Sequence, residues 1–255
     1  DVEKLQPSGV LEALGHAFFT LSLGMGAMIT YGSYQREKTL IVQQSIAIAV
    51  LDTAVALLAC MMMFPIIFTY DQDAGAGPGL VFMSMPLAFS EIGAGGMFLA
   101  VVFFGLLVCA ALTSSISLLE VVASYFMDER GWSRRKAAWT IGGAIFVVSL
   151  PVAFSMDGRN PMSGWEESTG MNFFDTMDYL TSNWMLPLGG LLIAIYAGWI
   201  MPRRMQRAEV GDVNSLVFQG WLLLVRFVAP ILVIIVLLQK IGLIDANEVM
   251  WHVMP

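Results

Sequence analysis

The chain contains six separate apolar runs, each about as long as a membrane-spanning helix, and these runs limit the folds open to it. A helix needs about 20 consecutive apolar residues to cross the hydrocarbon core of a bilayer. Inside that core every backbone amide and carbonyl must be paired within the protein, which only helices and closed barrels achieve. The runs cover residues 10–34, 41–70, 97–127, 136–154, 177–201 and 218–241. The sequence therefore predicts an all-α polytopic membrane protein with a single membrane domain over residues 1–255.

Composition argues against a water-soluble domain and gives no sign of nucleic-acid binding. Hydrophobic residues make up 57% of the chain and charged residues 13%, whereas about a quarter of the residues in a soluble domain are charged. The net charge is -7 and the basic residues form no patch, so no nucleic-acid partner is expected. Both cysteines, Cys60 and Cys109, lie inside apolar runs, which favours packing roles over a disulfide or a metal site.

The first apolar run contains a segment that is poorly suited to a continuous helix. Within the stretch Gly15–Thr30, residues Ser22–Gly26 read Ser-Leu-Gly-Met-Gly, and each glycine inside a helix costs about 1 kcal/mol relative to alanine. A break at mid-membrane depth exposes backbone groups and is tolerated only where it lines a cavity or holds a ligand. We therefore predict an unwound hinge at a binding site. A continuous helix whose glycines allow close packing is the alternative.

The distribution of lysine and arginine predicts the orientation of the chain. Nine basic residues lie in one set of connections and three in the opposite set, with Arg226 inside the last run. Positive charge concentrates on the cytoplasmic side, so the N-terminus of this segment, the structured loop expected over 71–96 and the C-terminus are predicted to lie outside. A chain that enters from outside and begins at Asp1 favours further spans upstream. The nine residues are Arg36, Lys38, Arg130, Arg134, Arg135, Lys136, Arg203, Arg204 and Arg207.

Carboxylates within the apolar runs carry a strong functional signal. Asp52 lies near the middle of the second run, where a carboxylate costs about 2.5–3.5 kcal/mol on membrane-insertion scales. It therefore needs a cation, a proton or, as a purely structural acceptor, a hydrogen-bond donor. Asp178 opens the fifth run at its outer end, where a solvated or helix-capping carboxylate also fits the spacing. His16 has no partner at metal-ligand spacing and is expected to be a hydrogen-bonded core residue.

Small hydroxyl residues share one face of the third run. Ala110, Thr113, Ser114 and Ser117 follow one another at offsets of 0, 3, 4 and 7, which places them on one side of a helix. Such a face can supply oxygen ligands, or it can bring two helices close together. Glu120 continues the face toward the cytoplasm. We expect it to border a water-filled exit path or to pair with a basic loop residue.

Three motifs in this order resemble the sodium-dependent neurotransmitter symporter family, in particular its bacterial amino-acid transporters. Residues 17–26, Ala-Phe-Phe-Thr-Leu-Ser-Leu-Gly-Met-Gly, resemble the broken sixth span of that family. Residues 110–117 resemble its eighth span and residues 174–178 the start of its tenth, and the resemblance covers essentially all 255 residues. It implies the inverted-repeat transporter fold of the leucine-transporter type. This chain then resembles the C-terminal six spans of an eleven-span member and lacks the first five.

The resemblance implies two sodium sites, each completed by the missing spans. Thr20 and Asp52 resemble ligands of the first site. Ala110, through its carbonyl, and Thr113 and Ser114, through their hydroxyls, resemble ligands of the second. Hydroxyl, carbonyl and carboxylate oxygens suit a hard cation such as Na⁺. Many family members need chloride beside the first sodium ion, whereas the carboxylate of Asp52 could supply that negative charge itself, so chloride is not expected to be required.

The resemblance also implies a substrate pocket and a gate. Phe19 resembles an aromatic lid over the substrate, and Asp178 resembles the acidic half of an outer gate. His16 departs from the glutamine that is common in the family motif. Met25 and Leu118 would form an apolar, deformable wall, which suits a hydrophobic side chain. The pocket positions are Phe19, Thr20, Ser22, Gly24, Met25, Ser114 and Leu118.

The expected function is sodium-coupled symport of a small hydrophobic amino acid by alternating access, in the inner membrane of a bacterium. The expected partners are the amino acid, the lipid bilayer and the upstream spans, and a homodimer is compatible with the sequence. No Ser/His/Asp set, paired aspartates or HExxH motif points to an enzyme. An ion channel subunit is a weaker alternative, because a single broken helix with an acidic midplane site resembles an occluding pocket more than a ring of pore charges. A truncated chain that does not transport is a further alternative.

Overall fold

The computed structural model describes residues 7–35, 41–69, 79–156, 162–211 and 214–243. Nearly all of these residues are helical, and no strand occurs among them. Packing divides the chain into two compact units. Unit 1 comprises residues 1–44 together with 119–255, and unit 2 comprises residues 45–118.

The first predicted span is broken. Helix α1 runs over Pro7–Thr20 and α2 over Ala27–Ser33, with turns and bends between them. In this connecting segment Ser22, Gly24 and Gly26 have φ angles of 53°, 80° and 82°. These angles lie in the left-handed region that glycine adopts most readily. The predicted hinge is therefore confirmed, and the alternative of a continuous helix is wrong.

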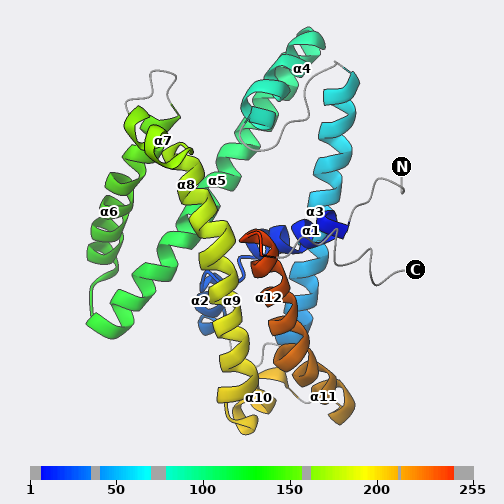
Figure 1. Cartoon of the computed structure of the whole chain (residues 1–255), viewed down its shortest axis with the longest axis vertical. Helices are drawn as coiled ribbons and strands as arrows, with labels where there is room; N and C mark the ends of the chain where they lie inside the picture. Colours follow the sequence, from blue (N-terminus) through cyan, green and yellow to red (C-terminus); the bar gives the residue numbers. More distant parts are fainter. Residues whose placement is uncertain (1–6, 36–40, 70–78, 157–161, 212–213, 244–255) are drawn as a thin grey trace. The chain divides into compact units, whose positions relative to one another are not determined.

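The remainder of unit 1 consists of the last part of α5 (Ala94–Arg130) and the helices that follow it. These are α6 (Arg134–Ser155), α7 (Ser163–Thr169), α8 (Phe173–Leu180), η3 (Thr181–Met185), α9 (Leu186–Ile195), η4 (Tyr196–Ile200), α10 (Arg203–Val210), α11 (Ser215–Leu223), η5 (Leu224–Val228) and α12 (Ala229–Lys240). Side-chain oxygens of Ser133, Asn172 and Asn214 accept hydrogen bonds from the first turns of α6, α8 and α11, which stabilises the starts of these helices. Figure 1 shows α9 and α12 side by side.

Three short turns of π-helix, η3, η4 and η5, interrupt the last two spans of unit 1. A π-helical turn inserts an extra residue, and such turns are frequent at functional sites. The first of them, η3, lies between Asp178 on α8 and the start of α9. The sequence pattern did not indicate any of these turns.

Unit 2 contains most of α3 (Ile41–Thr69), the short helices η2 (Leu80–Ser84) and α4 (Met85–Glu91), and the first part of α5 (Ala94–Arg130). Ile67, Met85 and Phe89 form its buried core. The short helices occupy part of the stretch 71–96 that was predicted to be a structured outer loop; residues 71–78 of that loop lie outside the described residues.

Five helices among the described residues are long and apolar enough to cross a membrane. They cover Ile41–Thr69, Gly95–Arg130, Arg134–Ser155, Phe173–Ile200 and Ser215–Gln239. Most of their large apolar side chains are exposed on this chain, and such surfaces suit contact with lipid or with further spans. Cys60 and Cys109 are free thiols and are exposed, so the expected role in packing is not seen within the described part of the chain.

Candidate functional site

The broken span provides the most distinctive local geometry of unit 1. Helix α1 ends at Thr20, and the amides of Leu21, Ser22 and Leu23 still donate to the carbonyls of its last turn. Beyond that turn the chain leaves the helical path. The C-terminus of a helix carries carbonyls that lack intrahelical partners and a partial negative charge. This end of α1 can therefore attract a cation or the ammonium group of an amino acid.

Helix α9 holds the break in place by contacts between backbones. A Cβ atom added to Gly24 would overlap the carbonyl of Leu186, and one added to Gly189 would overlap the carbonyl of Gly24. A Cβ on the next residue, Gly190, would lie 2.7 Å from Cε1 of Phe18. Glycines on both segments are thus required for this approach, because any side chain would separate them. Gly24 was identified from the sequence, whereas Gly189 and Gly190 were missed; their signal was an adjacent glycine pair inside an apolar run.

The residues of the proposed pocket that belong to unit 1 lie on or next to the break. Phe19 and Thr20 are exposed at the end of α1, and Ser22, Gly24 and Met25 are half-buried in the connecting segment. These five positions are neighbours in the sequence, so their proximity does not depend on contacts between distant segments.

His16 is exposed on α1, so the expectation of a buried, hydrogen-bonded histidine is wrong for this chain. The reason lies in the helix geometry. Phe18 points toward Gly190 of α9, and a residue two positions away lies about 200° around the helix. His16 is therefore turned away from α9.

Asp178 lies exposed on α8, and its Oδ1 atom accepts a hydrogen bond of 3.1 Å from the Ser182 hydroxyl. The first turn of α8 carries Asp175, whose carboxylate accepts from the Asn172 side chain. Asn172, and not Asp178, caps the start of this helix, because the Oδ1 atom of Asn172 accepts a hydrogen bond from the amide of Asp175. Asp178 itself is left at the surface with one hydroxyl partner among the described residues.

The remaining site residues belong to unit 2. Ala110, Thr113, Ser114 and Leu118 lie on α5 and are exposed, and Asp52 is half-buried on α3. The hydroxyl of Thr113 donates to the carbonyl of Ala110 at 2.8 Å. This bond leaves the lone pairs of the hydroxyl oxygen directed away from the helix, where they can accept or coordinate. No hydrogen bond or ion pair among the described residues joins Asp52 to this face of α5.

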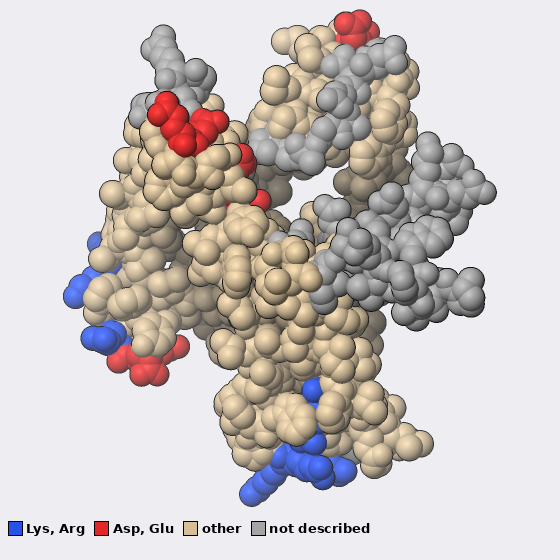
Figure 2. Space-filling model, viewed as in Figure 1, with Lys and Arg blue, Asp and Glu red and all other residues tan. Residues whose placement is uncertain are grey.

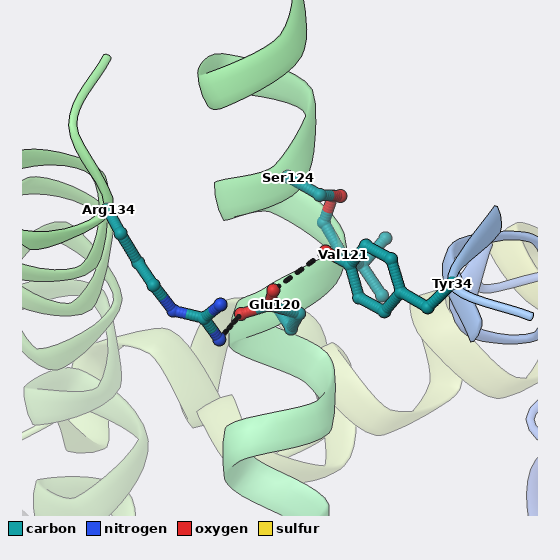
Figure 3. A network of polar contacts seen from close by, with 5 residues as sticks. All are labelled: Tyr34, Glu120, Val121, Ser124 and Arg134. Atoms are coloured by element: carbon teal, nitrogen blue, oxygen red, sulfur yellow. Dashed lines mark hydrogen bonds and ion pairs between the residues drawn. The ribbon is translucent and has the colours of Figure 1, made fainter.

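A polar network joins α2 to the last turns of α5 within unit 1 (Figure 3). Tyr34, which follows α2, donates from its hydroxyl to Oε1 of Glu120 at 2.8 Å, and Arg134 donates to Oε2 of the same carboxylate at 3.0 Å. The carboxylate is 14% exposed and the arginine 72%. The pairing of Glu120 with a basic residue is therefore confirmed, whereas the water-filled exit path stays a prediction. Tyr34 was missed, because nothing in its local sequence marks it.

Helix α2 is thus attached to α5 at both of its ends. At the start of α2, a Cβ atom on Gly26 would lie 3.3 Å from Cγ1 of Val121, which indicates close packing there. At its other end the Tyr34 hydroxyl reaches Glu120. Because α2 has only 7 residues, these two contacts fix its position relative to the end of α5.

The described residues contain no cluster of three or more His, Cys, Asp or Glu side chains that could hold a metal ion. Transition-metal sites are usually built from such clusters. The oxygens available near the break and on α5 are hydroxyls, carbonyls and single carboxylates. Neutral hydroxyl and carbonyl oxygens, which each of the two units offers by itself, suit a hard monovalent cation.

Comparison with known proteins gives consistent matches along the chain. A model of the family described as the "Sodium:neurotransmitter symporter family" matches residues 1–255. An uncharacterized sodium-dependent transporter, YhdH, from Bacillus subtilis is 33% identical over 251 residues, which cover 94% of this chain and 53% of the relative. An uncharacterized sodium-dependent transporter from Haemophilus influenzae is 32% identical, over 94% of this chain and 52% of its own length.

A solved structure also matches. The crystal structure of MhsT in complex with L-phenylalanine superposes with a TM-score of 0.81 at 40% sequence identity. The match covers 92% of this chain and 52% of MhsT. This chain therefore spans about half the length of the curated relatives and of the solved structure that it matches.

Proposed function

This chain belongs to the sodium:neurotransmitter symporter family, and we propose that it forms the C-terminal half of a sodium-coupled symporter for a small hydrophobic amino acid that works by alternating access. Membership of the family implies use of Na⁺ and a multi-pass membrane location. The relatives are named transporters and not enzymes. The identity of the amino acid and the alternating-access cycle are part of the proposal.

The observation that carries the proposal is the break between α1 and α2. Three left-handed residues end the helix inside an apolar run, and within a membrane the carbonyls freed at such a break need a ligand or a lined cavity. Broken helices of this kind hold substrates and coupling ions near the middle of the membrane in transporters. The similar MhsT was crystallised in complex with L-phenylalanine, and this ligand, together with the apolar Met25 and Leu118, supports a hydrophobic substrate.

We assign two sodium sites to this chain. Thr20 and Asp52 are proposed to contribute to the first, and Ala110, Thr113 and Ser114 to the second. In this assignment Phe19 covers the bound amino acid, and Asp178 closes the outer side with a basic partner from an upstream span. The distribution of basic residues supports an outside location for the C-terminus and for the N-terminus of this segment, in a bacterial inner membrane. A homodimer stays a prediction.

Asp52 makes chloride unnecessary in this proposal. Two opposite unit charges about 4 Å apart attract each other by roughly 4 kcal/mol at an effective dielectric constant of about 20. This is comparable with the cost of about 2.5–3.5 kcal/mol for a carboxylate at mid-membrane. Bound Na⁺ would therefore compensate the charge of Asp52.

The test of the proposal is uptake by the intact transporter in proteoliposomes. An inward Na⁺ gradient should drive accumulation of phenylalanine or a similar hydrophobic amino acid, and K⁺ in place of Na⁺ should abolish it. Ser114→Ala should raise the Na⁺ concentration needed for half-maximal uptake. Ser115→Ala is the matched control, because its hydroxyl donates to the Ala111 carbonyl and it lies about 100° further around α5.

Four outcomes would contradict parts of this proposal. Equal uptake in K⁺ would refute sodium coupling. An unchanged Na⁺ requirement in both Ser114→Ala and Thr113→Ala would indicate that the hydroxyl face serves helix packing and does not bind Na⁺. Ion currents far above the turnover rate of a carrier would favour an ion channel over a symporter. Robust uptake by residues 1–255 alone would contradict the proposal that the sodium sites are shared with upstream spans.

The chloride dependence of uptake distinguishes an Asp52 that supplies negative charge to the sodium site from an Asp52 with a purely structural role. The unmutated transporter should work without chloride. Asp52→Ser should lose uptake in chloride-free medium and regain part of it when chloride is added. A chloride requirement in the unmutated protein, or normal chloride-free uptake by the variant, would refute this role.

A further inference from the structure

Arg226 is an arginine inside an apolar helix that is held rigidly by the neighbouring span. Its Nε donates to the carbonyl of Gly198, and a Cβ atom on Gly198 would lie 3.0 Å from Cγ of Arg226. The ring of Trp199 lies 5.5 Å from the guanidinium carbon, and its Nε1 donates to the backbone carbonyl of Arg226 at 3.2 Å. The contacts lie where η4 meets η5. The guanidinium is therefore fixed at a defined place by a glycine, a carbonyl and an aromatic ring.

That place is the end of a membrane span. Gly198 lies two residues before Ile200, where the apolar helix Phe173–Ile200 ends, so Arg226 lies level with this end. An arginine at such a depth requires a negative partner or access to the interface. Among the described residues no carboxylate pairs with Arg226, since the ion pair found there joins Arg134 to Glu120. No described residue forms a hydrogen bond or ion pair with the terminal nitrogens of Arg226, so within the described part of the chain these nitrogens can donate to an anion.

Helix α10 adds further positive charge at the same turn. Gln206 of α10 is buried, and its Nε2 donates to the Ala197 carbonyl at 2.6 Å, next to the carbonyl that binds Arg226. Helix α10 also carries three exposed arginines and one glutamate, Arg203, Arg204, Arg207 and Glu209. Figure 2 shows basic side chains gathered at this end of unit 1, where α9 is followed by α10 in Figure 1.

We propose that Arg226 and the arginines of α10 form a binding site for the phosphate headgroup of an anionic phospholipid. Guanidinium groups bind phosphate oxygens in bidentate geometry, and a site at the end of two apolar spans faces headgroups, whose phosphates lie at that depth. An anionic lipid adds a net charge that a zwitterionic lipid lacks, which is why the site selects phosphatidylglycerol over phosphatidylcholine. This inference does not depend on the transported substrate or on sodium coupling.

Native mass spectrometry of the intact transporter tests the site. Phosphatidylglycerol and phosphatidylcholine are titrated separately, with inorganic phosphate as the free-anion arm. Arg226→Gln should weaken binding of one phosphatidylglycerol molecule about fivefold, the expected effect of one basic residue near an anionic surface, and leave phosphatidylcholine unchanged. Arg226→Lys should restore part of the affinity. Arg135→Gln, an exposed basic residue at the start of α6, is the matched control and should have no such effect.

A second variant guards against misfolding of Arg226→Gln. Arg203→Gln combined with Arg207→Gln changes only exposed positions of α10 and should weaken phosphatidylglycerol binding by a larger factor than Arg226→Gln. Unchanged phosphatidylglycerol binding in both variants would overturn the proposal. So would equal losses with phosphatidylcholine, or saturation of the site by inorganic phosphate alone.

Discussion

Two of the closely spaced glycine pairs in unit 1 differ in their effect, because Gly24 and Gly26 interrupt their helix whereas Gly142 and Gly143 do not. Gly24 and Gly26 lie in the segment between α1 and α2 with positive φ angles. Gly142 and Gly143 lie in the middle of α6, which continues without interruption from Arg134 to Ser155. A glycine pair alone therefore does not predict a break.

The surroundings of the two pairs explain the difference. The chain at Gly24 lies against the backbone of α9, so that a Cβ atom would overlap the Leu186 carbonyl. Around Gly143 no atom lies within 4 Å of an added Cβ. A proline inside an apolar run does not by itself break the helix either, because α3 continues through Pro65 and α6 through Pro151. The break is stabilised by a partner that fits an irregular backbone, and the glycines make that fit sterically allowed.

The largest effect is expected for Gly24→Ala. An L-residue at a φ of 80° costs about 1–2 kcal/mol, and the overlap with the Leu186 carbonyl adds about 1–3 kcal/mol, as is usual for overpacking. We expect a lower thermal unfolding temperature of the intact transporter in detergent and loss of sodium-dependent uptake. Wild-type uptake and stability in this variant would show that the break does not need its contact with α9.

A smaller loss is expected for Gly189→Ala. This residue already has a helical backbone, where alanine is favoured over glycine by about 1 kcal/mol, but its Cβ atom would overlap the carbonyl of Gly24. The free-energy cost of this overlap, about 1–3 kcal/mol, should exceed the gain from the higher helix propensity of alanine. We therefore expect reduced thermal stability and a higher Na⁺ requirement for uptake. Gly190→Ala should cost less, because the obstructing atom is the ring of Phe18, and combining it with Phe18→Leu should recover most of the loss.

The smallest effect, with the opposite sign, is expected for Gly143→Ala. The site is open, and replacing glycine by alanine inside a helix stabilises it by about 0.5–1 kcal/mol. Thermal unfolding of the intact transporter should shift slightly upward, and uptake should be unchanged. A loss of stability as large as that of Gly189→Ala would remove the distinction between the two glycine pairs.

The sequence predicted the all-helical membrane fold and the position of the break, because both follow from local composition. Long apolar runs predict helices, and Ser22–Gly26 combine low helix propensity with a location at mid-membrane depth. The pairing of Glu120 with a basic residue was one of two alternatives expected from its position three residues beyond Ser117, the other being a water-filled exit path.

Other features depend on contacts between distant segments and could not be predicted from one sequence. The role of Gly189 and Gly190 becomes visible only when α9 lies against the break. The role of Tyr34 depends on its hydrogen bond to Glu120, which lies 86 residues later in the chain. The wrong expectation for His16 has the same origin, since burial of a helical residue depends on which face meets a neighbour.

We propose that this chain, together with its upstream spans, binds Na⁺ and a hydrophobic amino acid at the same time. Equilibrium binding of labelled phenylalanine to the purified intact transporter, measured over a range of Na⁺ concentrations with K⁺ as the replacement, tests it most directly. We predict saturable binding that requires Na⁺, that is independent of chloride, and that needs more Na⁺ in Ser114→Ala than in Ser115→Ala. Binding of equal affinity in K⁺ and in Na⁺ would contradict the account.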